Sequence, residues 1–256
     1  MKAQITLMIS LLLPFMTWGQ DLKSLFEQAN EAYKRSEYNH AIDLYQEILA
    51  TGKVSPKVYF NLGNAYFKDN QLGKSILNYE RALQLDPADT DIQYNLRLAK
   101  SKTIDKEDER LLLFYEVWWK SLYMTQSSDG WAITAVIFIL LFFIFTGIYL
   151  FIRIRSVRKF SFYIALFFLL SFVFSIVFAQ KQYNILTDNT QAIVMNPRVT
   201  VKSSPSEQSP DLFLIHEGTK LTIRNAINEW YEIQLPDGNI GWIKQESIEK
   251  ISVVSD

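Results

Sequence analysis

The chain has 256 residues, of which 49% are hydrophobic, a net charge of -1 and no cysteine. The lack of cysteine excludes disulfide bonds, thiol catalysis, cysteine-bound zinc or iron–sulfur sites and a lipid anchor on cysteine, and a net charge near zero gives no global field to attract nucleic acid. Charge is dense over residues 21–110 and almost absent over residues 131–152 and 160–179. This uneven distribution predicts several modules of different kinds.

The first residues have the pattern of a secretory signal peptide. A positively charged start is followed by an apolar core over residues 5–16 and by two small residues, Thr17 and Gly19, that suit a cleavage site. The apolar core is too short to cross a membrane comfortably. We therefore expect residues 1–19 to be a signal peptide, with an uncleaved N-terminal anchor as the alternative. Either one predicts that the chain that follows is exported.

An internal repeat occupies residues 25–87. Similar residues recur at one constant offset in the pairs Ala29/Gly63, Asn30/Asn64, Tyr33/Phe67, Lys34/Lys68, Ala41/Ser75, Ile42/Ile76, Tyr45/Tyr79 and Leu49/Leu83. The second copy carries the motifs Tyr59-x-x-Leu62-Gly63-x-x-Tyr66, Tyr79-x-x-Ala82 and Asp86-Pro87. This pattern resembles the tetratricopeptide repeat (TPR), which has a period of about 34 residues and forms a pair of antiparallel helices in each repeat. We expect an all-α TPR domain over residues 20–100, with two repeats and a capping helix near residues 90–99.

The TPR resemblance implies that the concave face of the array binds peptides or partner proteins. The residues expected to line this face are Phe26, Asn30, Tyr33, Lys34, Phe60, Asn64, Phe67 and Lys68. The alternative for each aromatic residue is that it packs inside the array. One TPR subclass grips C-terminal carboxylates with Asn and Lys or Arg. Asn30 and Asn61 match that pattern, but Phe26, Asp91 and Asn95 stand at the basic positions. A carboxylate clamp is therefore not expected.

Residues 101–130 form a charged linker followed by an aromatic segment. Tyr115, Trp118, Trp119 and Tyr123 cluster within residues 111–124. Such residues suit a helix that lies at the level of the lipid headgroups. The alternative is that this segment packs on the cap of the TPR array.

Two runs without charge follow, over residues 131–152 and 160–179. Each is long enough to cross a hydrocarbon core of about 30 Å at about 1.5 Å per residue. Neither contains an ionisable side chain that would mark a transport path, so we expect two transmembrane helices that act as anchors. The loop between them, residues 153–159, carries the topology determinants Arg153, Arg155, Arg158 and Lys159. The positive-inside rule predicts that this loop is cytoplasmic and that the flanking domains share the opposite face.

From residue 191 onward the pattern alternates between apolar and polar residues, which predicts about six short strands and an all-β barrel over residues 190–252. The segments resembling bacterial SH3 (SH3b) domains are Val199-Thr-Val-Lys-Ser-Ser-Pro205, Glu217-Gly218-Thr219, Trp230-Tyr231-x-Ile233 and Leu235-Pro-Asp-Gly238-x-x-Gly241-Trp242-Ile243. Alternation assigns Tyr231, Ile233 and Leu235 to the core and Trp230 to the outer face. Trp230, with Trp242 as a weaker candidate, would suit a peptide or glycan groove. The alternative is that the loop over residues 203–209 covers Trp230.

The chain shows no pattern of catalytic or ligand-binding chemistry. His40 and His216 lie in different modules without neighbours at metal-ligand spacing, and no phosphate-binding or nucleophile motif is present. Basic residues are scattered along the chain, which disfavours nucleic-acid binding. We therefore expect no catalytic residue, no cofactor and no metal.

The order of the modules resembles one family as a whole, the BatE-type proteins of the Bacteroides aerotolerance operon group. This resemblance implies a two-pass protein of the bacterial inner membrane with periplasmic TPR and SH3b domains. It also implies an envelope complex with other membrane proteins of the same operon group and a link to oxidative or envelope stress. The expected function is a non-enzymatic scaffold that binds protein partners. The alternative is a sensor or tether that binds peptidoglycan through the SH3b domain.

Overall fold

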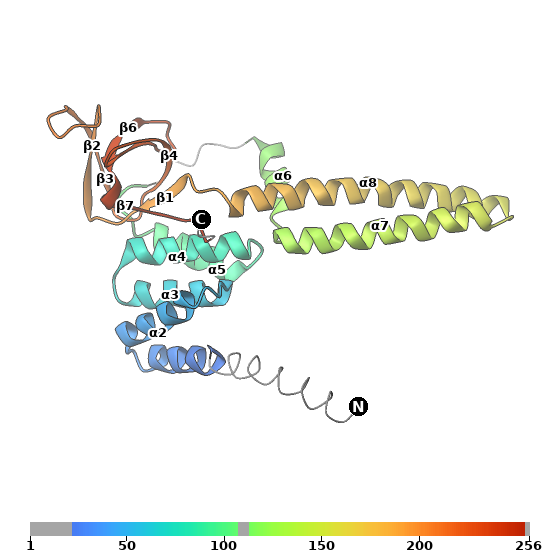
Figure 1. Ribbon diagram of the computed structural model, residues 1–256, viewed down its shortest axis with the longest axis horizontal. Helices are drawn as coiled ribbons and strands as arrows, with labels where there is room; N and C mark the ends of the chain where they lie inside the picture. Colours follow the sequence, from blue (N-terminus) through green and yellow to red (C-terminus); the bar gives the residue numbers. More distant parts are fainter. Residues whose placement is uncertain (1–21, 107–112, 254–256) are drawn as a thin grey trace, which may run out of the picture. The chain divides into compact units, whose positions relative to one another are not determined.

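The computed structural model describes residues 22–106 and 113–253, and the predicted signal peptide lies outside them. The chain divides into two compact units. Of the described residues, the first, here called the repeat–barrel unit, contains 22–83, 90–106 and 189–251. The second, here called the hairpin unit, contains 84–89, 113–188 and 252–253. Figure 1 shows the helices and strands of each unit.

The helices of the TPR array follow the sequence repeat. They are a helix over residues 22–34, α2 (Tyr38–Ala50), α3 (Pro56–Lys68), α4 (Leu72–Leu85) and α5 (Thr90–Lys100). Pro56 begins α3, where its fixed φ suits the first helical position and its missing N–H costs nothing. Ser36 and Asn70, which occupy equivalent positions of the two repeats, have φ of 63° and 60° in the turns that follow the first helix of each repeat.

The third repeat is incomplete. Its first helix is α5, which begins one repeat period after the start of α3. Residues 101–106, which follow α5, form turns instead of a second helix. The last helix of the array therefore has no helical partner of its own repeat among the described residues.

Small residues allow the helices of the array to approach closely. Ala29, Ala41 and Ala82 are completely buried. A Cβ atom added at Gly63 would lie only 2.7 Å from Cδ1 of Tyr79, so no larger residue fits there without a shift of that ring. The repeat thus alternates small residues with the large side chains that fill the space beside them.

The C-terminal part is an antiparallel, all-β sheet that matches the SH3b expectation. Its strands are β1 (Gln191–Val194), β2 (Arg198–Lys202), β3 (Asp211–His216), β4 (Lys220–Ile227), β5 (Trp230–Gln234), β6 (Ile240–Lys244) and β7 (Ile248–Lys250). Their order in the sheet is β3-β2-β6-β5-β4-β1-β7. Ile233 is fully buried and Tyr231 and Leu235 pack on the same core, which confirms the predicted core face of β5.

The strand β7 was not expected from the sequence. It has three residues and follows a 3-10 turn over Gln245–Ser247, and it pairs with β1 at the edge of the sheet. A strand of three residues is too short to display a two-residue period, so tertiary pairing defines it.

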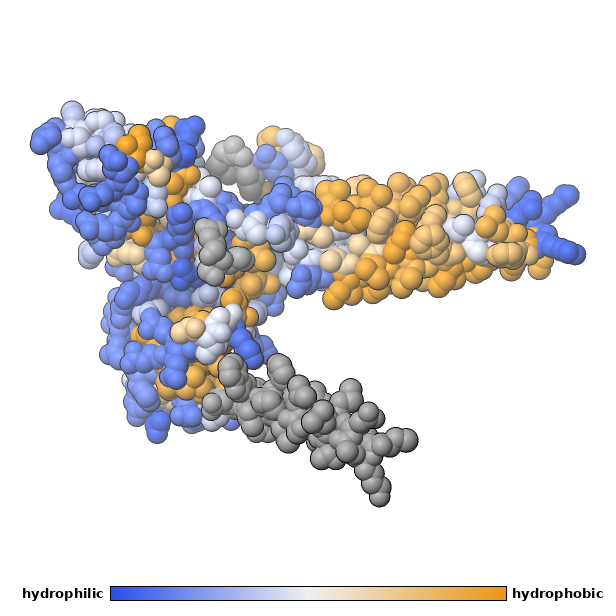
Figure 2. Space-filling model, viewed as in Figure 1, coloured by the Kyte–Doolittle hydropathy of each residue, from blue (hydrophilic) through white to orange (hydrophobic). Residues whose placement is uncertain are grey.

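The hairpin unit contains α6 (Phe114–Tyr123), α7 (Ser128–Phe151) and α8 (Arg155–Leu186). The last two helices are long and apolar enough to cross a membrane. They pack against each other along the hairpin, and Figure 2 shows that hydrophobic residues cover most of the face of the hairpin turned to the viewer. The apolar run predicted over residues 160–179 therefore lies entirely in α8, and the run predicted over residues 131–152 lies in α7 except for its last residue, Ile152.

The basic segment between the two long helices differs from the prediction. A seven-residue loop was expected over residues 153–159, but α8 already begins at Arg155, and only residues 152–154 lie outside the helices. Arg155, Arg158 and Lys159 therefore belong to the start of α8, and Arg153 alone of the four basic residues precedes it. The hydropathy profile fixes where charge begins but not where the helix begins, because Arg and Lys are good helix formers.

The helix α6 packs against α8 within the hairpin unit. The centre of the Phe178 ring lies 5.1 Å from that of Trp119 and 4.9 Å from that of Trp131. The carbonyl oxygen of Tyr123 accepts hydrogen bonds from Trp131 Nε1 at 3.0 Å and from Gln182 Nε2 at 2.8 Å. These contacts fix the C-terminal end of α6 beside one end of the hairpin.

Candidate functional site

A hollow of about 320 Å3 lies in the TPR array. It is lined by Asn30, Tyr33, Lys34, Tyr45, Asn61 and Asn64. Four of these residues are among those predicted to bind partners. Tyr45 and Asn61 are additions: Asn61 lies on α3 beside predicted residues, whereas Tyr45 lies on α2, which carries none of them.

Each repeat forms the same hydrogen bond at this hollow. Tyr45 Oη donates to Asn30 Oδ1 at 2.7 Å, and Tyr79 Oη donates to Asn64 Oδ1 at 2.7 Å. The two bonds join equivalent positions of the two repeats, so they are a property of the repeat. Because each hydroxyl engages the amide oxygen, the amide nitrogen of each asparagine remains available as a donor.

Burial keeps these two tyrosine hydroxyls protonated. Phe26 packs 6.0 Å from the ring of Tyr45, and Phe60 packs 5.9 Å from the ring of Tyr79. Burial raises the pKa of Tyr45 to about 12 and raises the pKa of Tyr79 as well. The two hydroxyls therefore stay protonated and keep donating at any physiological pH.

A third asparagine joins the first of these pairs. Asn61 Nδ2 donates to Asn30 Oδ1 at 2.9 Å, so that oxygen accepts two hydrogen bonds. The side chain of Asn30 is thus fixed from both helices that flank the hollow. The comparison between the two repeats does not reveal Asn61, since its equivalent is Glu27; the resemblance to carboxylate-binding TPR proteins drew attention to it, and the structure adds its bond to Asn30.

The aromatic residues predicted to line the concave face are half-buried. They therefore combine the two alternatives that the sequence left open, which are a place on the binding face and packing inside the array. Phe26 and Tyr33 pack on the core of the first repeat, and Phe60 and Phe67 pack on a second core cluster. None of the four is fully buried. Their inner edges stabilise the array while their outer edges contribute apolar surface.

Lysine recurs at the repeat offset, and its first copy, Lys34, lines the hollow. Lys34 and Lys68 are exposed, and Lys34 Nζ pairs with Glu31 at 2.7 Å. Lys102 stands one repeat period after Lys68, with its Nζ 5.9 Å from the centre of the Phe67 ring. Lys102 was not predicted as a site residue, although the offset alone could have found it. Lysines and asparagine amides together offer hydrogen-bond donors to a ligand that is rich in acceptors.

On the barrel, Trp230 and Trp242 share the face opposite the core. Glu232 pairs with Trp242 across β5 and β6, and Trp230 pairs with Lys244, so alternation directs both tryptophans outward. Both are half-buried. Glu207, in the loop over residues 203–209, forms an ion pair with Lys244 and so brings this loop to the same face.

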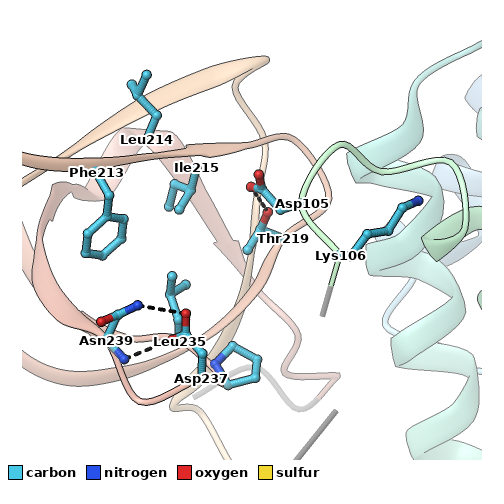
Figure 3. Close-up of a pocket in the computed structure, with 10 residues that line it drawn as sticks. Asp105, Lys106, Phe213, Leu214, Ile215, Thr219, Leu235, Asp237 and Asn239 are labelled. Carbon is cyan, nitrogen blue, oxygen red and sulfur yellow. Dashed lines mark hydrogen bonds between the residues drawn. The ribbon is translucent and has the colours of Figure 1, made fainter. Parts of the chain in front are cut away.

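A second pocket, of about 360 Å3, opens beside the barrel (Figure 3). It is lined by Asp105, Lys106, Phe213, Leu214, Ile215, Thr219, Leu235, Pro236, Asp237 and Asn239. Its acidic groups are engaged by the protein itself: Asp105 accepts a bond from Thr219 Oγ1 at 2.7 Å, and Asp237 accepts from Asn239 Nδ2 at 2.7 Å. Within residues 22–106 and 113–253, no group of three His, Asp or Glu side chains could hold a metal ion.

Comparisons with known proteins assign the two modules of the repeat–barrel unit. A TPR repeat model matches residues 63–102, and a bacterial SH3 domain model matches residues 197–249. The chain therefore combines TPR repeats, two apolar helices and a bacterial SH3 barrel. Both assigned modules are non-catalytic binding modules.

Two curated proteins share part of the sequence. Sperm-associated antigen 1 of Rattus norvegicus is 30% identical over 87 residues, which are 34% of this chain and 10% of that protein. Serine/threonine-protein phosphatase T of Aspergillus oryzae is 30% identical over 81 residues, which are 32% of this chain and 17% of that protein. The phosphatase match lies in the TPR region. The chain spans a tenth to a sixth of these relatives, so the similarity concerns one module of each.

Proposed function

We propose that the protein is a non-enzymatic, membrane-anchored scaffold that binds protein partners in the hollow of its TPR array. The observation that carries this proposal is the hydrogen bond from tyrosine to asparagine that both repeats form behind the hollow. It holds the amide groups of Asn30 and Asn64 in place before any partner arrives, and such preorganisation lowers the cost of binding. The ligand would be an extended peptide whose backbone carbonyl groups accept from these amides.

The membrane anchor in this proposal is the α7–α8 hairpin. In the most apolar 18-residue windows of α7 and α8, only 6% and 17% of the residues are buried. A core helix of a soluble protein would be mostly covered, so this exposed apolar surface supports contact with lipid. Aromatic residues at both ends, including Trp131 at one and Tyr149 and Tyr163 at the other, suit the two lipid–water interfaces.

The proposed orientation places both binding modules in the periplasm and the basic turn in the cytoplasm. The support is the concentration of Arg153, Arg155, Arg158 and Lys159 at the end of the hairpin where α7 meets α8. The partners would then be exported or membrane proteins. Membership of an aerotolerance complex of the BatE type, with partners from the same operon group and a role in oxidative or envelope stress, is part of this proposal.

The orientation can be tested with single cysteines, because the chain has none of its own. A membrane-impermeant maleimide applied to spheroplasts should label Lys57→Cys in the array and leave Ser156→Cys in the basic segment unlabelled until the membrane is permeabilised. Labelling of Ser156→Cys in intact spheroplasts would contradict the proposed orientation and indicate the opposite one.

Partner binding can be tested by crosslinking in native membranes followed by affinity capture and mass spectrometry. The double variant Asn30→Ala/Asn64→Ala should lose the proteins captured by the parent chain. Gln28→Ala removes an exposed amide from the same helix and should retain them. Equal capture by both variants would contradict binding in the hollow.

A second candidate function is a tether to peptidoglycan through the barrel. The outward, half-buried Trp230 and Trp242 favour it, because aromatic side chains with one free face are suited to stacking on sugars. Detergent-solubilised protein should then sediment with purified peptidoglycan, and Trp230→Ala should abolish that sedimentation. Sedimentation of the parent and the variant to the same extent would exclude the outer face of β5 as the peptidoglycan-binding surface.

A further inference from the structure

The incomplete third repeat is covered by the barrel. One hydrophobic cluster joins Ile76 and Tyr79 of α4 and Ala99 of α5 to Ile193 of β1 and Ile251 after β7. All five of these side chains are at most 1% exposed. The barrel therefore occupies the apolar face that the second helix of a third repeat would otherwise cover.

A buried charge connects the same elements. The carboxylate of Glu80 in α4 pairs with Lys100 Nζ of α5 at 3.0 Å and with Lys220 Nζ of β4 at 2.9 Å, while its side chain is only 7% exposed. Its neighbour Arg81 donates through Nη2 to Glu249 Oε1 at 3.0 Å and to the carbonyl oxygen of Lys250 at 2.9 Å. A buried carboxylate must be paired to be tolerated, so this cluster depends on the barrel being in place.

The turn after α5 is also bound to the barrel. Asp105 Oδ2 accepts from the backbone nitrogen of His216 at 2.6 Å and from Thr219 Oγ1 at 2.7 Å, and Asp105 Oδ1 lies 2.9 Å from His216 Nδ1. At the start of α4, the backbone nitrogen of Gly73 donates to Glu217 Oε1 at 2.7 Å. The β3–β4 turn of the barrel is thus held from two sides of the array.

Glycine stands on both sides of this interface, where the two modules come closest. A Cβ atom added at Gly73 would lie 2.8 Å from Cγ of Glu217 and 3.0 Å from the carbonyl oxygen of Val194. A Cβ atom added at Gly218 would lie 2.8 Å from both Ile76 Cδ1 and Thr103 Cγ2. Contacts this close leave no room for water, unlike the wet and loosely packed contacts between independent domains.

We propose that the barrel is the C-terminal cap of the TPR array, so that α4 and α5 keep their native structure only while the barrel is docked on them. The contact region, here called the seam, joins α4, α5 and the turn after α5 on the array side to β1, the β3–β4 turn, Lys220 and residues 249–251 on the barrel side. This role differs from ligand binding by the outer face of the barrel and does not require it. It gives the SH3b module a structural function whether or not a ligand is bound to it.

The test compares two glycines of the barrel in the full-length protein in lipid nanodiscs. Gly218 and Gly238 both lie in turns with positive φ, 85° and 95°, but a Cβ atom at Gly238 meets nothing within 4 Å. Alanine therefore strains the backbone at both positions, but its Cβ atom clashes with the array only at Gly218. Gly218→Ala should make amide hydrogen exchange in α4 and α5 roughly tenfold faster than in the parent, whereas Gly238→Ala should leave those amides unchanged.

Equal exchange of α4 and α5 in the two variants would overturn the proposal. So would a Gly218→Ala protein in which the barrel has lost its protection while α4 and α5 have kept theirs. Gly73→Ala supplies an independent check from the array side, since alanine by itself favours a helix. It should accelerate amide hydrogen exchange in β1 of the barrel. Slower exchange in α4 with no change in β1 would contradict the proposal that the barrel caps the array.

A consequence for the hollow rests on the proposed function. Tyr79 belongs to the buried cluster of the seam and also holds Asn64 at the hollow. If partners bind there, Gly218→Ala should reduce their capture and Gly238→Ala should not. Loss of protection in α4 without loss of capture would uphold the cap and refute binding through Asn64.

Discussion

The seam and the α7–α8 hairpin are both rich in apolar residues, yet their apolar surfaces are disposed in opposite ways. Ile76 and Ile193 in the seam are completely buried, and the charges beside them are paired. The hairpin leaves large side chains such as Leu140 and Phe143 more than half exposed. The seam is therefore stabilised by exclusion of water within one chain, whereas the hairpin needs an apolar environment from outside it.

This difference determines what each region tolerates. A charge in the seam is acceptable when a partner from the other module meets it, as Lys220 meets Glu80. A charge in the middle of the hairpin would have no such partner. The predictions below test this contrast, beginning with the largest expected effect.

The largest effect is expected from Glu80→Ala. It removes the buried carboxylate that Lys100 and Lys220 share, and breaking a buried ion pair by removing one partner costs about 3–5 kcal/mol of unfolding free energy. Urea denaturation of the full-length protein in detergent, followed by circular dichroism, measures the loss. The matched control is Glu31→Ala, which removes an exposed partner of Lys34 and should leave the midpoint unchanged. Comparable midpoints for the two variants would show that the seam does not depend on its buried charge.

Acid should weaken the seam through the same carboxylate. Burial by itself raises the pKa of Glu80, but Lys220 and Lys100 outweigh it and lower the pKa from 4.5 to about 2. A lowered pKa means that the stabilisation is complete above pH 4.5 and is lost as the pH falls toward 2, by an amount on the order of 3 kcal/mol. Denaturation midpoints measured from pH 6 to pH 2 should therefore fall more steeply for the parent than for Glu80→Ala. Parallel curves for the two proteins would contradict this origin of the acid sensitivity.

The hairpin is expected to respond to an added charge. Leu140 is 57% exposed on α7, and Leu140→Arg should disfavour insertion by about 2.5–3.5 kcal/mol if that surface faces lipid. The measurement is the fraction of protein that remains in the membrane pellet after carbonate extraction. Leu140→Ala keeps the position apolar and should stay in the pellet. Retention of both variants would mean that a protein surface or water covers this part of α7.

The same contrast explains which features the sequence could predict. The hairpin helices are apolar on every side and the TPR period repeats side chain by side chain, so Trp131, Asn30 and Asn64 could be placed from the sequence alone. The seam could not be predicted, because Ile76 and Ile193 lie far apart in the chain and nothing in the local sequence distinguishes them from core residues of their own modules. Nothing in the sequence around Glu80 predicts that its partner is Lys220. The outward orientation of Trp230 followed from alternation, while its half-buried state depends on the loop that carries Glu207.

The smallest effect is expected where the seam meets the hollow. Tyr79→Phe and Tyr45→Phe each remove one hydroxyl that donates to an asparagine, and each should lower the unfolding free energy by about 1 kcal/mol. Because Tyr45 belongs to the core of the first repeat and Tyr79 to the seam, only the hydroxyl is common to both changes. Equal losses, measured by urea denaturation, would mean that the repeat builds the two hydrogen bonds independently of what packs behind them. A clearly larger loss for Tyr79→Phe would mean instead that the barrel tightens the second bond, and the hollow would then have one rigid half and one that depends on the cap.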